Sequence, residues 1–90
     1  MTRDELSHRV ASDCGLSVVL TDRVVRATLE RLSEALEQGQ RIELRKFGVF
    51  WVQEWPGRTV VDPVTQQAHR IPSRRVARFR PSTTLKSRLN

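Results

Sequence analysis

The chain has 90 residues, enough for one small domain but only a modest core in a lone subunit. Residues 1–40 carry 5 Lys/Arg against 7 Asp/Glu, and residues 41–90 carry 11 against 3, so the net charge of +6 divides into −2 and +8. This asymmetry predicts a polyanionic partner for the second half, chiefly nucleic acid, although an anionic membrane or an acidic protein would also fit the charge.

The sequence disfavours two further classes, membrane-spanning proteins and secreted proteins. No stretch approaches the roughly 20 apolar residues of a membrane-spanning helix. Cys14 is the only cysteine and cannot form a disulfide within the chain, and the first ten residues lack the layout of a secretion signal. We therefore expect a cytoplasmic protein with no membrane partner.

A first helix is predicted over about residues 3–13. Thr2 and Glu5 have the spacing of a capping box at its start. Apolar residues then follow at four-residue steps on one helical face, namely Leu6, Val10 and Cys14. On this pattern Cys14 is expected to be a small buried hydrophobe.

A second helix is predicted over about residues 18–37, with Gly39 just past its end. Its apolar stripe is formed by Val25, Leu29, Leu32 and Leu36. Additional apolar positions, Val24, Ala27 and Ala35, widen this stripe beyond what one short partner helix would cover. We therefore expect the helix to pack against more than one element.

After Gly39 the apolar period changes to two, and a β-prone run, residues 49–52, follows Gly48. This predicts a β-hairpin that turns near residues 46–48. Residues 56–75 hold three of the four prolines and four arginines but few large apolar groups, so this segment should project into solvent. Strand character returns at 76–81, and a short last helix is predicted over 82–90, with Leu85 and Leu89 at four-residue spacing.

The order of elements predicts an α+β fold with one three-stranded antiparallel sheet, a protruding β-arm and a short C-terminal helix. We divide the single domain, 1–90, into a helical dimerisation part (1–40), the sheet (41–55 and 76–81), the arm (56–75) and the last helix (82–90). If about 20 residues project, about 70 remain for the body, a size at which a lone core is marginal. Dimerisation is therefore expected to be a condition for folding.

Residues 45–50, RKFGVF, place a glycine in an aromatic segment, and Pro63 is followed closely by Thr65. These features resemble the glycine-centred aromatic turn and the arm tip of the HU and integration host factor family of bacterial DNA-bending proteins. Val76, residues 79–81 and residues 85–88 are similar to its closing strand and helix. The resemblance covers the whole chain.

The resemblance implies an intertwined dimer whose two β-arms embrace double-stranded DNA through the minor groove. It also implies that a proline at each arm tip, here Pro63, wedges between base pairs. A rigid, apolar ring without an N–H suits that place. The tip departs from the family pattern at Val61, Asp62 and Gln66, where a basic residue, an asparagine and a glycine are usual.

The candidate DNA-contacting residues are basic and fall into two groups, apart from Pro63 at the tip. Those expected on the arm are Arg58, Arg70, Arg74 and Arg75. Those expected on the floor between the two arms are Arg45, Lys46, Arg78, Arg80 and Lys86. Arginine suits both places because its planar fork pairs with phosphate and fits narrow grooves.

The candidate dimer core is apolar, and its members are Leu29, Leu32, Leu36, Phe47, Phe50 and Phe79. An alternative role for the three phenylalanines is base stacking between cations, but their places beside Gly48 and within strand patterns favour packing. Trp51 and Trp55 are interpreted as packing at the base of the arm.

We expect no enzymatic activity, no cofactor and no metal site. His8 and His69 lie far apart in the sequence, and one cysteine completes no zinc set. No glycine elbow, phosphate-cradling loop or HExxH motif is present.

The leading hypothesis is an architectural protein that binds and bends double-stranded DNA with little base readout, associated with the nucleoid as a homodimer or with a related chain as a heterodimer. The alternatives are a site-selective bender, a protein-interaction or scaffold module on the same fold, and a binder of RNA.

Overall fold

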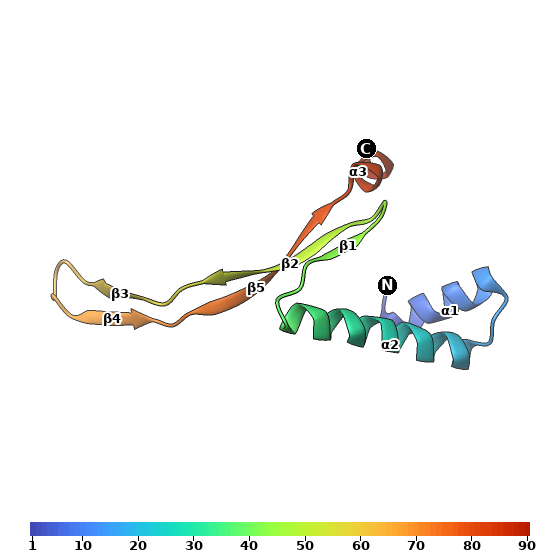
Figure 1. Cartoon of the computed structure of the whole chain (residues 1–90), viewed down its shortest axis with the longest axis horizontal. Coiled ribbons are helices and arrows are strands. Elements are labelled where there is room, and N and C mark those ends of the chain that lie inside the picture. The colour runs from blue at the N-terminus through green and yellow to red at the C-terminus, as the bar shows by residue number, and fades with distance from the viewer.

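The computed structural model describes all 90 residues, Met1–Asn90. Three helices and five strands follow one another in the chain (Figure 1). Their bounds are α1 (Arg3–Cys14), α2 (Val18–Glu37), β1 (Ile42–Leu44), β2 (Gly48–Trp55), β3 (Arg58–Val61), β4 (Ala68–Ile71), β5 (Arg74–Pro81) and α3 (Thr83–Leu89). None of the helices combines the length and the apolar character that a membrane crossing requires.

The helical hairpin begins at the N-cap that the sequence predicts. The Thr2 hydroxyl accepts the Glu5 N–H at 3.1 Å, and Gly15 ends α1 in the left-handed conformation at φ 66°. The Ser7 hydroxyl donates to Asp22 Oδ1 at 3.0 Å, which ties α1 to α2. This hydrogen bond is the first cause of a lowered pKa of the Asp22 carboxyl. The prediction for Cys14 was wrong for the single chain, because its side chain at the end of α1 is exposed.

The three-stranded antiparallel sheet has the order β1-β2-β5, as predicted. The hairpin between β1 and β2 turns at residues 45–47, where Lys46 adopts a φ of 65°. At Gly48 a Cβ atom would stand 2.5 Å from the Phe79 ring and 2.6 Å from the Arg80 carbonyl oxygen. Glycine is therefore required there for β5 to lie beside β2.

The β2 and β5 ladder gives the sheet two chemically different faces. Directly paired residues share a face, and the face alternates along each strand. Phe50 opposite Phe79 and Val52 opposite Ala77 share the inner face, where Val52 and Ala77 lie beside α2. The outer face carries Trp51 opposite Arg78, Trp55 opposite Arg74, and Val49 opposite Arg80.

The arm is a two-stranded ribbon of β3 and β4, separated from the main sheet by Pro56-Gly57 on one strand and Pro72-Ser73 on the other. The sequence had placed the arm at 56–75, but Arg74 and Arg75 already pair with Trp55 and Glu54 in the main sheet. The observed arm is therefore shorter than predicted. Arg74 and Arg75 are both polar, so no alternation of apolar and polar residues marks them in the sequence as part of a strand.

The single chain is extended (Figure 1), and it encloses almost no core. Its radius of gyration is 19.8 Å, whereas about 12 Å is expected of a compact chain of this length. Only four residues are buried, namely Ser7, Ala11, Thr21 and Gly48. Large apolar side chains on α2, on the sheet and at the arm tip are exposed instead, and such surface marks a place for a partner.

Arg75 fastens the sheet to the end of α2. Its Nη2 donates to the carbonyl oxygens of Leu36 at 3.2 Å and Glu37 at 2.9 Å, and its Nε lies 3.6 Å from Glu54 Oε1. The Leu36 carbonyl also accepts the Gly39 N–H at 2.9 Å. A guanidinium is well suited to both carbonyls, because they lie in the last turn of the helix, where the helix dipole gives them partial negative charge. Arg75 therefore sets how the base of the arm stands relative to the helices.

We predict that Arg75→Ala lowers the free energy of unfolding by about 1 kcal/mol, because two charge-assisted hydrogen bonds at a half-exposed site are lost. Thermal unfolding followed by circular dichroism checks this value. Arg74→Ala is the matched control, since Arg74 is the neighbouring arginine on the opposite face. An equal decrease in the free energy of unfolding in the two variants would contradict the role given to Arg75.

Candidate nucleic-acid interface

The outer face of the sheet is basic along β5. Arg74, Arg78 and Arg80 are separated by even numbers of positions along this strand and so share one face, with Val76 between the first two. Arg78 Nε donates to Gln53 Oε1 across the ladder at 3.0 Å, which holds its guanidinium over the sheet. Three exposed cations are thereby lined up along one strand, a spacing suited to a linear polyanion.

A groove of about 750 Å³ lies at the turn end of this sheet. Four of the predicted floor residues line it together, namely Arg45, Lys46, Arg80 and Lys86. They come from the β1–β2 turn, from β5 and from α3. Glu43 is the only acidic residue in the lining, and its Oε1 lies 3.4 Å from Arg41 Nη2, so its charge is offset locally.

The position of α3 brings Lys86 to this groove. The Ser82 N–H donates to the Phe47 carbonyl oxygen at 2.9 Å, and the Ser82 hydroxyl accepts the Leu85 N–H at 3.0 Å. The first bond fastens the start of α3 to the turn, and the second caps the helix. Figure 1 shows α3 at the end of β5, away from the helical hairpin.

The predicted arm arginines do not share one face. Arg58 is opposite Ile71, and Arg70 is opposite Thr59, which is one position further along β3. Arg58 and Arg70 therefore extend from opposite faces of the ribbon. Arg58 lines a cavity with Trp55 and Arg74, so it continues the outer face of the sheet. A ribbon with a cation on each face can meet phosphates on both sides of a groove.

The arm tip is ordered by Asp62. Its Oδ1 accepts the Val64 N–H at 2.8 Å and lies 3.4 Å from the Thr65 nitrogen, an Asx turn that spans Pro63. The hydrogen bond from Val64, followed by that from Thr65, lowers the pKa of the Asp62 carboxyl. Asp62 is thus a local cap for the turn as well as a negative charge at the tip.

Pro63 and Val64 are exposed at the end of this turn, and the Val64 side chain is 89% exposed. Gln66 closes the turn at φ 58°, a left-handed conformation that favours glycine. Gln66 and Asp62 thus meet the two backbone demands of this turn, a left-handed residue and a side-chain acceptor. The Asp-Pro pair could have indicated such a turn in the sequence.

Two findings change the set drawn from the sequence. Arg75 faces α2 and its guanidinium is already hydrogen-bonded there, so the structure separates it from the other candidate contacts. Trp51 and Trp55, interpreted as packing residues, stand on the outer face opposite Arg78 and Arg74. The period-two alternation from Val49 onward could have placed them there.

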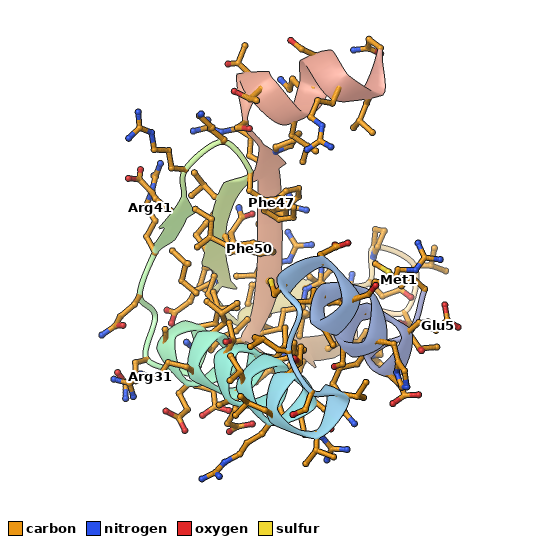
Figure 2. All side chains as sticks on the ribbon, turned by 90° about the vertical axis from the view of Figure 1, so that its right-hand side faces the viewer. Met1, Glu5, Arg31, Arg41, Phe47 and Phe50 are labelled. Atoms are coloured by element: carbon orange, nitrogen blue, oxygen red, sulfur yellow. The ribbon has the colours of Figure 1, made fainter.

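The candidate dimer-core residues form an apolar surface on the other side of the sheet. Phe50 and Phe79 have ring centroids 4.6 Å apart, and Phe47 lies 5.6 Å from Phe79. Yet Phe47 is 46% and Phe79 42% exposed, which is far from a closed core. Figure 2 shows Phe47 and Phe50 close together on the sheet. Apolar residues of α2 also stay partly open, namely Leu29, Leu32 and Leu36.

Comparison with known proteins supports this interpretation of the fold. Over 99% of its length the chain matches a structure described as an Anabaena HU–DNA cocrystal, with a TM-score of 0.82, 29% sequence identity and 97% of that chain covered. A variant of HU from Thermotoga maritima matches with a TM-score of 0.75 and 26% identity, and both chains are covered fully.

Curated relatives agree with the structural matches. Integration host factor subunit beta of Marinobacter nauticus is 36% identical, covering 100% of this chain and 93% of the relative. DNA-binding protein HU of Thermotoga maritima is 34% identical, covering 99% of each. The model of a family described as bacterial DNA-binding protein matches residues 1–90. The chain therefore belongs to the bacterial DNA-binding protein family of HU and integration host factor.

Proposed function

We propose that this protein is an architectural factor that binds and bends double-stranded DNA as a homodimer, largely without reading base edges. The observation that carries the proposal is the outer face of the sheet. Arg74, Arg78 and Arg80 line this face, and Arg58 continues it onto the arm. A surface of guanidinium groups recognises the phosphate backbone, which is the same for every sequence.

In the proposed complex, the groove around Arg45, Lys46, Arg80 and Lys86 forms the floor on which the duplex lies. The arm then follows the minor groove, with Arg58 and Arg70 directed to phosphates on its two sides. Arg75 is left out of the proposed contacts because it lies on the inner face and its Nη2 is hydrogen-bonded to carbonyl oxygens of α2. Selectivity would arise from how easily a DNA segment deforms rather than from a code of side chains.

Bending is assigned to the tip. Pro63 and the exposed Val64 give each arm an apolar end that can enter a base step. Unstacking one step costs a few kcal/mol, and the added phosphate contacts of a bent duplex must offset that cost. The Asx turn at Asp62 supports this role, since a wedge needs a fixed backbone to transmit force.

We propose a homodimer because the single chain does not enclose a core of its own. The phenylalanine cluster and the apolar stripe of α2 are open on the single chain, and a second copy offers surfaces of the same chemistry. Two copies would also place two basic faces and two arms on one duplex. A heterodimer with a related chain would satisfy the same physical need.

A protein-interaction module is the second candidate, and the arm tip favours it. Val60, Val61 and Val64 are exposed apolar residues there, next to the charge of Asp62. Such a tip offers less attraction to phosphate than a cationic one. Weak binding of DNA that hardly changes with salt would favour this candidate. The remaining alternative, binding of RNA, is tested by comparing the affinities for RNA and DNA duplexes of matched length.

We predict that the protein sediments at micromolar concentration as a dimer, with twice the 10.4 kDa mass of the chain. Leu32→Asp should separate the subunits and unfold them together, because the new charge would be buried without a partner. Sedimentation equilibrium with circular dichroism checks both parts. A folded monomer in either protein would contradict the proposed dimer.

We predict a steep salt dependence of DNA binding. If a dimer neutralises roughly 6–10 phosphates, log affinity falls against log salt concentration with a slope of about −5 to −9. Arg80→Ala should flatten the slope and weaken binding on all sequences alike. Fluorescence anisotropy with a labelled duplex at several salt concentrations measures this. A slope shallower than about −2 would speak for the protein-interaction module.

We predict that binding and bending separate at the tip. Pro63→Ala should reduce the bend, measured by energy transfer between the ends of a short duplex, and reduce it less on nicked DNA. Asp62→Asn keeps an oxygen that can accept the Val64 N–H but removes the negative charge, so it should tighten binding, most at low salt. If neither variant differs from the parent, the tips do not touch DNA.

A further inference from the structure

We propose that Trp55, together with Arg74 and Arg58, forms a pocket at the base of the arm that takes one unpaired base with its phosphate. The proposal rests on the proposed function, because it places this pocket on the face that receives DNA. It adds a stacking site to a surface otherwise built for phosphates.

The first observation is that the Trp55 ring has no aromatic partner within the chain. It is the last residue of β2, it lies on the outer face, and it remains 45% exposed. The three phenylalanines pair among themselves, and neither tryptophan takes part in an aromatic pair. A large planar ring held open at a rigid strand end is a platform for another planar group.

The second observation is the cavity beside this ring. It measures about 630 Å³, within the range of small-molecule sites. Its lining consists of Trp55, Pro56, Arg58, Ile71, Pro72 and Arg74. The prolines give it stiff walls, and both charged residues are cations.

The lining selects the chemical class of ligand. An aromatic face beside guanidinium groups, without a carboxylate, is the combination that binds a nucleobase and its phosphate in single-stranded nucleic acid. A base inside an intact duplex has both faces covered by its neighbours and cannot stack on Trp55. The ligand is therefore a base already free of pairing, as in a bulge, a gap or a damaged site, where little unstacking energy is needed.

The test uses Trp55 as its own reporter. Trp51→Phe leaves Trp55 as the only tryptophan in a chain that has no tyrosine. This variant is titrated with a duplex that carries one bulged thymidine and with the same duplex whose bulge is abasic. The two DNAs have equal numbers of phosphates, so only stacking distinguishes them. We expect strong quenching of Trp55 fluorescence and about tenfold tighter binding with the base present.

Variants at the ring complete the experiment. Trp55→Leu, which keeps apolar volume but loses the aromatic plane, should abolish the preference for the base over the abasic bulge. Its affinity for intact duplex should stay within about twofold, since the phosphate contacts remain. Trp51→Leu is the matched control on the same face of β2 but outside the cavity, and it should retain the preference. Circular dichroism confirms that both variants are folded.

The outcomes distinguish this proposal from the proposed function. Equal affinity and equal quenching with the two bulges, alongside normal binding of intact duplex, would overturn the pocket and leave the architectural function standing. Retention of the base preference in Trp55→Leu would also overturn it. Absence of any duplex binding by the parent protein would overturn both proposals together.

Discussion

The antiparallel ladder between β2 and β5 determines what every other part of this molecule can do. It runs from Gly48 opposite Pro81 to Trp55 opposite Arg74. Because side chains alternate between the two faces, the phenylalanines and the arginines are sorted to opposite sides of the same two strands. One set of backbone hydrogen bonds thus forms both an apolar surface for a partner and a basic surface for a polyanion. The close approach at Gly48, where no Cβ fits beside the Phe79 ring, makes glycine necessary at this position of the ladder.

The apolar side of the ladder explains the extended shape of the chain. A thin sheet with one helical hairpin near one end cannot enclose Phe47 and Phe79, and the radius of gyration of 19.8 Å reflects this. Within the HU and integration host factor family, that open surface is consistent with an intertwined dimer. Arg75 has a related role, since it secures the sheet to α2 through the Leu36 and Glu37 carbonyls where little apolar contact does so.

The basic side combines three kinds of chemistry along one direction. From the β1–β2 turn toward the arm tip, the order is the cations around the turn groove, then the aromatic ring of Trp55 at the base of the arm, and then the apolar tip with Pro63. Phosphate attraction is general, stacking requires a free base, and a wedge requires a deformable step. In the proposed function, a surface ordered in this way favours DNA that is already distorted and does not read its sequence.

The sequence by itself determined the elements and the family, because capping residues, apolar periods and the RKFGVF turn are local signals. The helix over 18–37 is confirmed, and the hairpin turn predicted near residues 46–48 lies at residues 45–47. The residue roles depended on tertiary structure. Cys14 is exposed, Arg75 of β5 is hydrogen-bonded to the end of α2, and Trp55 is paired with Arg74. These facts follow from strand pairing and helix placement across long sequence separations, and no local period encodes which face of a ladder a distant strand will cover.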